Sequence, residues 1–232
     1  MSEKWTLSRR SFLQLGATAG GGLVFTIYFR NSVLKAQTSG SFVPSAFVRI
    51  DPDNTITLWA KNPDMGQDVK TSMPMIIAEE LDADWSRVKI EQADLNTQAY
   101  GGQGSGGSDS IREDWDEMRK AGALARQILI LAAAQKWKVV PEECKTEKSQ
   151  VLHSASNNKI PYGGLVSDAV NIPAKEIKPV FKNPKDYKIL GARIGGIDTP
   201  RIVRGEPLYG IDVRVPGMLY AVIAKCPVYG GK

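Results

Sequence analysis

Two stretches of this sequence have residue types and positions suited to binding an anionic ligand. Residues 65–68 read Met-Gly-Gln-Asp and residues 101–108 read Gly-Gly-Gln-Gly-Ser-Gly-Gly-Ser, and each precedes a stretch of helical periodicity. The first turn of a helix has unpaired backbone N–H groups and carries about half a positive charge. Glycines let a ligand approach these N–H groups, and Ser105, Ser108 and Ser110 add hydroxyl donors. Two such loops in one domain are suited to an anionic cofactor with more than one polar end.

Simpler interpretations of the second loop stay open at this point. Ser108 or Asp109 can cap the following helix while the glycines form a mobile loop. Residues 102–107 match the dinucleotide pattern G-x-G-x-x-G, but that pattern follows directly on a buried strand, and here the polar segment 94–98 intervenes. No Lys-Ser or Lys-Thr pair follows the glycines, which excludes the phosphate-binding loop of nucleotide-hydrolysing enzymes.

The sequence has few residues that bind metals directly. It contains two cysteines and one histidine, which lie far apart as Cys144, His153 and Cys226. A structural zinc site needs about four closely spaced Cys or His ligands, and an iron–sulfur cluster needs about four Cys. Any metal chemistry must therefore use ligands that the protein does not supply, and we assign neither a catalytic residue nor a metal ligand.

The elements that must position the two loops are predicted from periodicity. Apolar residues at steps of two predict strands over 46–50, 55–60 and 87–92. Apolar residues at steps of three and four predict helices over 69–81 and 111–137. The first two strands form a hairpin, because Asp51-Pro52-Asp53-Asn54 between them is a turn-forming cluster. Pro74 falls inside the first helix, where we expect a kink or a helix that begins close to it.

The later part of the sequence predicts smaller elements and a change of domain. We expect a strand pair at 150–152 and 159–161, a short helix over 164–170, a Lys- and Pro-rich linker over 176–196, and a β-rich stretch over 201–228. Strands and helices do not alternate regularly, so the fold class is α+β and not a doubly wound parallel sheet. The run 219–227 is strand-like, and we expect the chain to stop inside a domain.

The N-terminus has the features of an export signal. Arg9 and Arg10 precede Phe-Leu and a weakly apolar, Gly-rich stretch, as in the twin-arginine signal, although the two arginines can also simply flank a helix. The apolar run is too short and too Gly-rich for the roughly 20 residues of a membrane span. The formal net charge of the whole sequence is +5. Without residues 1–36 the chain has 25 basic and 24 acidic residues, so its net charge is close to zero. A neutral mature chain gives no electrostatic case for binding nucleic acid, and we expect a periplasmic protein whose leader is cleaved near Ala36 or retained.

Several separated motifs resemble one known family. They are Met65-Gly66-Gln67, then Pro74-Met75-Ile76-Ile77-Ala78-Glu79-Glu80-Leu81, then the loop 103–108, then Ile197-Asp198-Thr199-Pro200 and the segments 209–213 and 216–221. In this order they resemble the N-terminal part of the large subunit of xanthine-oxidase-family molybdenum hydroxylases, in the branch of isoquinoline 1-oxidoreductase beta subunits and related aldehyde dehydrogenases. The resemblance implies a molybdopterin-binding-type α+β domain over 37–175 and the beginning of an α/β hammerhead domain over 197–232.

The resemblance also implies a cofactor, a reaction and partners. The cofactor is molybdopterin cytosine dinucleotide, whose dithiolene sulfurs hold the molybdenum and so account for the scarcity of Cys and His. Gln67 would lie beside the pterin or the metal's oxygen ligands, Met65 and Gly66 would shape the approach, and donors would come from Gly104, Ser105, Gly106, Gly107 and Ser108. The reaction is hydroxylation of an aldehyde or an N-heterocycle with water as the oxygen source. Electrons would leave through a small iron–sulfur subunit and a cytochrome c acceptor.

The sequence departs from this family in two places. The first motif usually reads Met-Gly-Gln-Gly, and here Asp68 brings a carboxylate that favours the helix N-terminus but repels phosphates. The family's general-base glutamate lies near the C-terminus of a much longer chain, and we interpret Glu79 and Glu80 as part of a solvated helix face and as capping neighbours. We therefore expect this chain by itself neither to turn over substrate nor to hold the cofactor tightly.

Two function classes follow from these expectations. In the first, the chain is part of a molybdenum enzyme, either as a split subunit whose partner carries the missing C-terminal half, or as a truncated or decayed product. In the second, it is an exported non-enzymatic α+β module that binds a partner or a small ligand through the glycine loops. A neighbouring reading frame that encodes the missing half would favour the split enzyme. The sequence does not specify the substrate.

Overall fold

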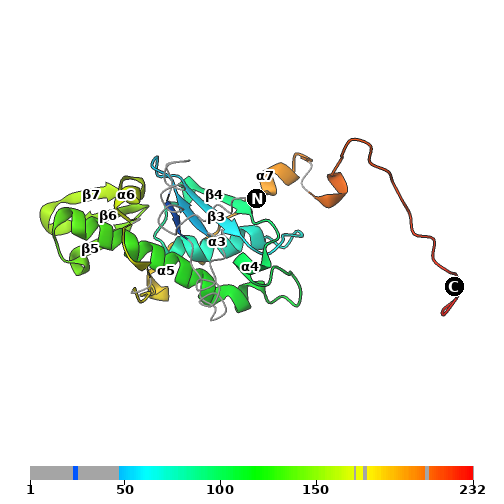
Figure 1. Ribbon diagram of the computed structural model, residues 1–232, viewed down its shortest axis with the longest axis horizontal. Coiled ribbons are helices and arrows are strands. Elements are labelled where there is room, and N and C mark those ends of the chain that lie inside the picture. Colours follow the sequence, from blue (N-terminus) through cyan, green and yellow to red (C-terminus); the bar gives the residue numbers. More distant parts are fainter. Residues whose placement is uncertain (1–22, 26–46, 170, 175–176, 207–208, 232) are drawn as a thin grey trace, which may run out of the picture. The chain divides into compact units, whose positions relative to one another are not determined.

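The computed structural model describes residues 23–25, 47–169, 171–174, 177–206 and 209–231 (Figure 1). The chain divides into two units, one ending at Ile197 and one beginning at Asp198. Both glycine loops belong to the first unit, which contains two sheets and two main helices. The mixture of helices with separate antiparallel and parallel strand pairs confirms the α+β fold class.

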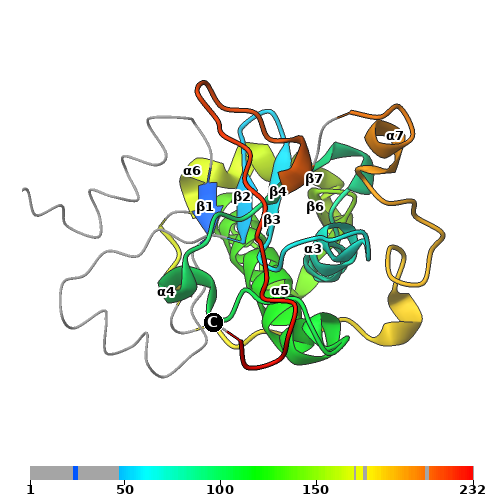
Figure 2. The same cartoon turned by 90° about the vertical axis from the view of Figure 1, so that its right-hand side faces the viewer.

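The first sheet contains the predicted hairpin and the predicted third strand. Its order is β1 (Leu23–Phe25), β2 (Val48–Ile50), β3 (Ile56–Ala60) and β4 (Val88–Gln92), which lie next to one another in Figure 2. The pairs β1–β2 and β2–β3 are antiparallel, whereas β3 and β4 are parallel from Ile56↔Val88 to Ala60↔Gln92. In the β2–β3 turn the Asp51 N–H donates to Thr55 O over 2.9 Å, as the turn-forming cluster predicts.

A helical crossover joins the two parallel strands. The helix α3 (Val69–Glu80) follows β3, packs on the sheet and leads through a short 3-10 helix (Trp85–Arg87) into β4. Pro74 lies inside α3, so the helix predicted over 69–81 is confirmed as one element with the proline in it. Parallel strands end at the same edge of a sheet, and the segments that follow Ala60 and Gln92 therefore leave from one place.

The long helix α5 (Ser110–Trp137) packs along α3 and completes the core. A short helix, α4 (Thr97–Tyr100), lies between β4 and the glycine-rich loop that precedes α5. The two helices approach each other closely at Gly122, where an added Cβ would lie 2.3 Å from Ile77 O. Fully buried residues of both helices and of β2 and β3 form one hydrophobic core, including Ile50, Leu58, Ile77, Met118 and Leu129.

A second sheet follows the C-terminal end of α5. It contains β5 (Cys144–Glu147), β6 (Gln150–His153) and β7 (Asn158–Pro161), all antiparallel, and is followed by α6 (Val166–Ala169). The strand pair β6–β7 and the short helix are confirmed. The strand β5 was missed because Cys-Lys-Thr-Glu contains no run of apolar residues.

Residues 177–197, which include most of the predicted linker, do not form a free connection. They belong to the first unit, and Ile189 is buried with 8% exposure. Lys182 of this segment contacts both main helices, with its ammonium on Glu79 of α3 and its carbonyl oxygen on Arg119 of α5, as described below.

The second unit lacks the predicted β structure. Its described residues contain a short helix, α7 (Thr199–Ile202), and a single 3-10 turn (Gly210–Asp212), and none of them is in a strand. The strand-like run 219–227 is unpaired, with Leu219 90% and Val222 96% exposed. The β-rich prediction for 201–228 is therefore wrong for this chain, because a strand needs a hydrogen-bonded neighbour.

Most of the predicted export leader lies outside the described residues. The exception is β1 (Leu23–Phe25), which pairs with β2 from Leu23↔Ile50 to Phe25↔Val48. Within the part of the chain that the structure describes, no helix is both long and apolar enough to cross a membrane.

Candidate functional site

The two glycine-containing loops meet at the edge where β3 and β4 end. The loop 61–68 continues β3 and leads into α3, and the loop 101–109 follows α4 and leads into α5. The Gln92 side chain at the end of β4 donates to Ala60 O over 2.9 Å and to Asn62 O over 3.1 Å. Ligands of sheets with parallel strands bind outside the carboxyl ends of those strands, and this edge is therefore the candidate site.

Asp64 organises the first loop. Its carboxylate accepts the Gly66 N–H over 2.7 Å and the Lys70 N–H over 3.0 Å, so it provides the capping contact at the start of α3. Asp68 is the N-cap residue by position, but it adopts a left-handed conformation with φ of 61° and its side chain makes no capping bond. Of the two contributions considered for Asp68, a side-chain cap is not made, because Asp64 accepts the Lys70 N–H instead.

Gln67 is turned into its own loop. Its side-chain oxygen accepts the Met65 N–H over 2.7 Å, and its side-chain nitrogen donates to Pro63 O over 3.3 Å. Met65 is 68% exposed. The three residues predicted to face the cofactor therefore form the exposed tip of the loop, and Gln67 must break these local bonds before it can reach a ligand.

Gln103 and Ser105 fasten the second loop to the first. Gln103 donates from its amide to Lys61 O over 3.1 Å and to Asp94 O over 3.0 Å, and its oxygen accepts the Asn96 N–H. The Ser105 hydroxyl donates to Pro63 O over 2.7 Å. The structure thus brings together the loop of Met65, Gly66 and Gln67 and the loop of residues 104–108, as the cofactor hypothesis requires.

The glycines of the second loop leave donors and space at this edge. A Cβ added at Gly104 or Gly106 would meet no atom within 4 Å. Within the described part of the chain, the N–H groups of Gly104, Gly106 and Gly107 donate to no protein acceptor. Asp109 occupies the N-cap position of α5 without a side-chain capping bond. Packing therefore does not require a glycine at 104 or 106, and the backbone donors fit an anionic or strongly polar group.

Lys61 and Asn62 form a buried polar pair beneath the loops that the sequence reasoning missed. The Lys61 ammonium lies 2.5 Å from Asp114 and 3.1 Å from Glu117, and it donates to Tyr100 O over 3.2 Å. Asn62 is 3% exposed, and its side-chain oxygen has no hydrogen-bond partner. The available signal was two polar residues directly after a buried strand. These contacts tie the end of β3 to the first turns of α5.

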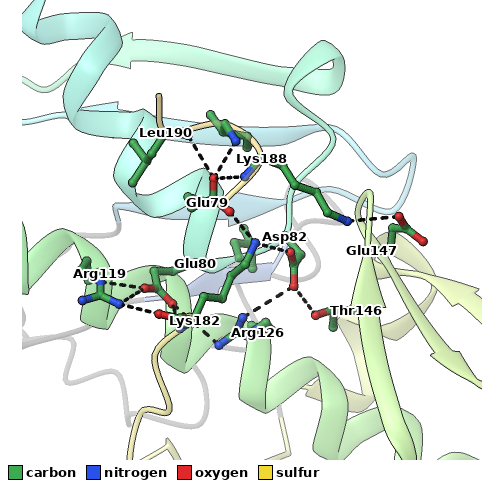
Figure 3. A network of polar contacts seen from close by, with 12 residues as sticks. Glu79, Glu80, Asp82, Arg119, Arg126, Thr146, Glu147, Lys182, Lys188 and Leu190 are labelled. Carbon is green, nitrogen blue, oxygen red and sulfur yellow. Dashed lines mark hydrogen bonds and ion pairs between the residues drawn. The ribbon is translucent and has the colours of Figure 1, made fainter. Parts of the chain in front are cut away.

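Glu79 is buried, contrary to the prediction of a solvated helix face. It is 1% exposed, and one carboxylate oxygen accepts the backbone N–H groups of Lys188, Ile189 and Leu190 over 2.9, 2.6 and 3.0 Å (Figure 3). Its other oxygen accepts the Lys182 ammonium. A buried carboxylate persists only when charge and hydrogen bonds compensate it, and here all its partners come from 182–190.

Glu80 is also buried, at 0% exposure, so the prediction is wrong for both glutamates. Its carboxylate accepts a hydrogen bond from Arg119 Nε over 2.7 Å and another from the Lys182 N–H over 2.9 Å. Arg126 lies 3.7 Å from Glu80 and 3.6 Å from Asp82, and Lys182 donates to Asp82 over 2.6 Å. These six residues, Glu79, Glu80, Asp82, Arg119, Arg126 and Lys182, are named the clamp.

The pKa values of two clamp residues follow from these contacts. Burial raises the pKa of the Glu79 carboxyl, but the Lys182 ammonium and the three backbone N–H donors outweigh it, so the pKa lies below its ordinary value. Burial lowers the pKa of Lys182, and the carboxylates of Asp82 and Glu79 outweigh that effect and raise it. Both groups are therefore held in their charged forms.

The described residues favour neither a metal site made of protein side chains nor a ligand site beside the clamp. Among them, no group of three or more His, Cys, Asp or Glu side chains is placed to hold a metal ion. A cavity of about 160 Å³ lies beside the clamp, lined by Glu79, Asp82, Trp85, Lys148 and Lys182 among others. It is not at the strand edge where the glycine loops meet, and its Glu79, Asp82 and Lys182 side chains are already paired with one another.

The sequence matches one family model and several curated proteins. Residues 4–192 match the model of the molybdopterin cofactor-binding domain. The beta subunit of isoquinoline 1-oxidoreductase from Brevundimonas diminuta is 30% identical over 97% of this chain and 34% of its own length. The membrane-bound aldehyde dehydrogenase [pyrroloquinoline-quinone] from Gluconacetobacter polyoxogenes is 32% identical over 99% of this chain and 31% of its own length. A nicotinate dehydrogenase subunit from Pseudomonas putida is 28% identical over 79% of this chain and 15% of its own length.

The chain spans about a third or less of the length of these relatives. Among solved structures, the Cu,Mo-CO dehydrogenase is similar over 51% of this chain and 15% of its own, with 22% identity and a TM-score of 0.43. Quinoline 2-oxidoreductase from Pseudomonas putida 86 is similar over 71% of this chain and 22% of its own, with 19% identity and a TM-score of 0.42.

Proposed function

We propose, since the chain belongs to the molybdopterin cofactor-binding domain family, that the paired loops 61–68 and 101–109 hold part of a molybdopterin cofactor for an oxidoreductase. The family match confirms the resemblance drawn from the sequence motifs. The observation that carries the proposal is the set of backbone N–H groups at Gly104, Gly106 and Gly107, which donate to no acceptor among the described residues at the edge where the loops meet.

The residues of the chain would bind and orient the cofactor, not react with it. The N–H groups of the second loop and the N-terminus of α5 would bind its anionic groups. The Ser105 hydroxyl donates a hydrogen bond to Pro63 O and so holds the two loops together. Gln67 is within the first loop, where release of its bonds to Met65 and Pro63 would free an amide for the ligand. When bound, the cofactor supplies a redox-active molybdenum with dithiolene sulfurs as its ligands.

The finer assignments rest on the same resemblance. We propose the cytosine dinucleotide form of the cofactor, because a dinucleotide has phosphates that the glycine loop can bind. We propose aldehydes or N-heterocycles as substrates, because the relatives carry the names of an isoquinoline, a nicotinate and an aldehyde enzyme. Electrons would pass to a small iron–sulfur subunit and then to a cytochrome c.

The binding proposal is tested on the full chain produced in a bacterium that makes the cofactor. Bound pterin is measured as its fluorescent oxidation product and molybdenum by mass spectrometry. Gly104→Val places a side chain among the free N–H groups, and we expect bound pterin to fall at least tenfold. Gly210→Val is the matched control, because a Cβ there also meets no atom within 4 Å but lies outside the loops. Because we expect the chain alone to bind weakly, the measurement is made with the cofactor in excess, and a folded parent chain that binds no pterin under that condition would contradict the proposal and favour the non-enzymatic binding module.

We further propose that residues 1–36 direct export to the periplasm by the twin-arginine pathway. A folded reporter fused behind these residues should reach the periplasm. Replacement of Arg9 and Arg10 by lysines should stop its export. A reporter that stays in the cytoplasm with both arginines present would contradict this assignment.

A further inference from the structure

Residues 178–197, named the strap, run along α3 and contact both of its ends. At the C-terminal end, Glu79 accepts three N–H groups of the strap and the Lys182 ammonium. At the N-terminal end, the Ile197 N–H donates to the Thr71 hydroxyl over 3.0 Å. Thr71 is 4% exposed and lies three residues after Asp68, where the first glycine-containing loop ends. The strap therefore spans α3 from the clamp to the start of the helix.

The strap also contacts α5, the helix that follows the second glycine loop. Arg119 donates to Lys182 O over 3.0 Å, and Arg126 donates to Val180 O over 2.6 Å. The Arg119 guanidinium lies 4.6 Å from the centre of the Phe181 ring. Figure 3 shows Lys182 between Glu79 and Asp82, with Arg119 and Arg126 on the α5 side. One segment thus holds both helices.

The helix α3 has internal weak points that make such a contact useful. Pro74 has no backbone N–H, so one hydrogen bond of the helix is missing. The first residue before α3, Asp68, has a left-handed backbone and gives no side-chain cap. The helix is 12 residues long, which is marginal for stability without tertiary contacts. Contacts at Thr71 and at Glu79 lie on the two sides of the proline.

We propose that the strap positions the first glycine-containing loop, with Glu79 and Lys182 as positioning residues. The clamp fixes the end of α3 against α5, and the bond to Thr71 fixes its beginning, so the loop 61–68 keeps its place beside the loop 101–109. The part of this inference that concerns cofactor binding rests on the proposed function. The part that concerns the position of the loop does not.

The test is hydrogen exchange of backbone amides, measured by mass spectrometry on the full chain without ligand. Glu79→Gln should raise exchange at 188–190 about tenfold and at 66–73 several-fold. Lys182→Met should do the same, whereas Lys182→Arg, which keeps the charge, should restore slow exchange. Val151→Ala is the stability control, because Val151 is fully buried in β6 of the second sheet and pairs there with Ile160.

The outcome that would overturn the inference is fast exchange at 188–190 with unchanged exchange at 66–73. Equal exchange at 66–73 in Glu79→Gln and in Val151→Ala, at matched urea midpoints, would also overturn it, because the effect would then be one of global stability. If the clamp variants do not fold, Thr71→Val removes only the second contact and should raise exchange at 66–73 alone. Unchanged exchange there would likewise overturn the inference.

Cofactor content of the same variants separates the two proposals. If the parent chain binds pterin, Glu79→Gln should bind less than Val151→Ala at matched stability. If the parent chain binds none, the proposed function fails, while the exchange data still decide whether the strap positions the loop.

Discussion

The glycine loops and the clamp are both rich in polar residues, but these residues differ in burial and in hydrogen-bond partners. At the tip of the first loop the polar groups are exposed and bonded within a few residues, and among the described residues the backbone donors at Gly104 and Gly106 have no protein partner. In the clamp, Glu79 and Glu80 are fully buried and bonded to residues about a hundred positions later. The clamp uses its polar groups for the fold, and the free donors of the loops are the groups that the proposed function assigns to a ligand.

The largest expected effect is the loss of stability when a buried charge of the clamp is removed. Glu80→Ala should lower the free energy of unfolding by about 3–5 kcal/mol, because it removes the carboxylate paired with the buried Arg119 and leaves Arg126 with Asp82 alone. Urea unfolding followed by circular dichroism measures this loss. Glu91→Ala on the exposed face of β4 is the control and should change stability by less than about 0.5 kcal/mol. Equal losses in both variants would refute the buried role of Glu80.

A second difference concerns glycines. Gly122→Ala should cost about 1–3 kcal/mol, because the new Cβ would lie 2.3 Å from Ile77 O where α3 and α5 meet. Gly104→Ala should change stability by less than about 0.5 kcal/mol, since a Cβ there meets nothing within 4 Å. Thermal unfolding of the two variants gives the comparison. A larger loss for Gly104→Ala would show that the loop glycines serve packing and not ligand access.

The clamp should also make stability depend on pH. The pKa of Glu79 is lower in the folded chain than its ordinary value, so its contribution is present above that ordinary value and is lost as the pH falls through the folded pKa. Urea midpoints measured from pH 7 downward should therefore fall more steeply for the parent chain than for Glu79→Gln. Glu91→Gln removes one carboxylate from an exposed position and should keep the parent's slope. Parallel slopes for Glu79→Gln and the parent would contradict the assignment.

The smallest expected effect is at Asp68, which stands where the family usually has glycine. Asp68→Gly should stabilise the chain by up to about 1 kcal/mol, because glycine adopts a positive φ without steric cost. It should also increase bound pterin, since it removes a carboxylate from the first loop. Asn157→Gly, at a φ of 54° in the second sheet, should give a similar gain in stability without any change in pterin. An increase of pterin in both variants would assign the effect to stability.

The sequence by itself determined the main helices and most of the strands of the first unit, and their order. Residue periodicity correctly predicted the β2–β3 hairpin, β4, both long helices and the β6–β7 pair, because period-2 and period-3.6 patterns reflect which face of an element is buried. The motifs at 65–67 and 103–108 also identified the family, which the match over residues 4–192 confirms. The strand prediction at 219–227 failed because apolar β-branched residues do not supply a neighbouring strand.

Only the tertiary structure decided what the polar residues do. Glu79 and Glu80 have the sequence appearance of a solvated helix face, and nothing near them in the chain indicates burial. Their partners are Arg119 and Arg126 on α5 and Lys182 with the N–H groups of 188–190 on the strap, far along the sequence. A charged side chain can be buried only when distant groups converge on it, and such convergence is a property of the folded chain. The meeting of the two loops at Pro63 and Ser105 is a result of the same kind, set by the parallel pairing of β3 and β4.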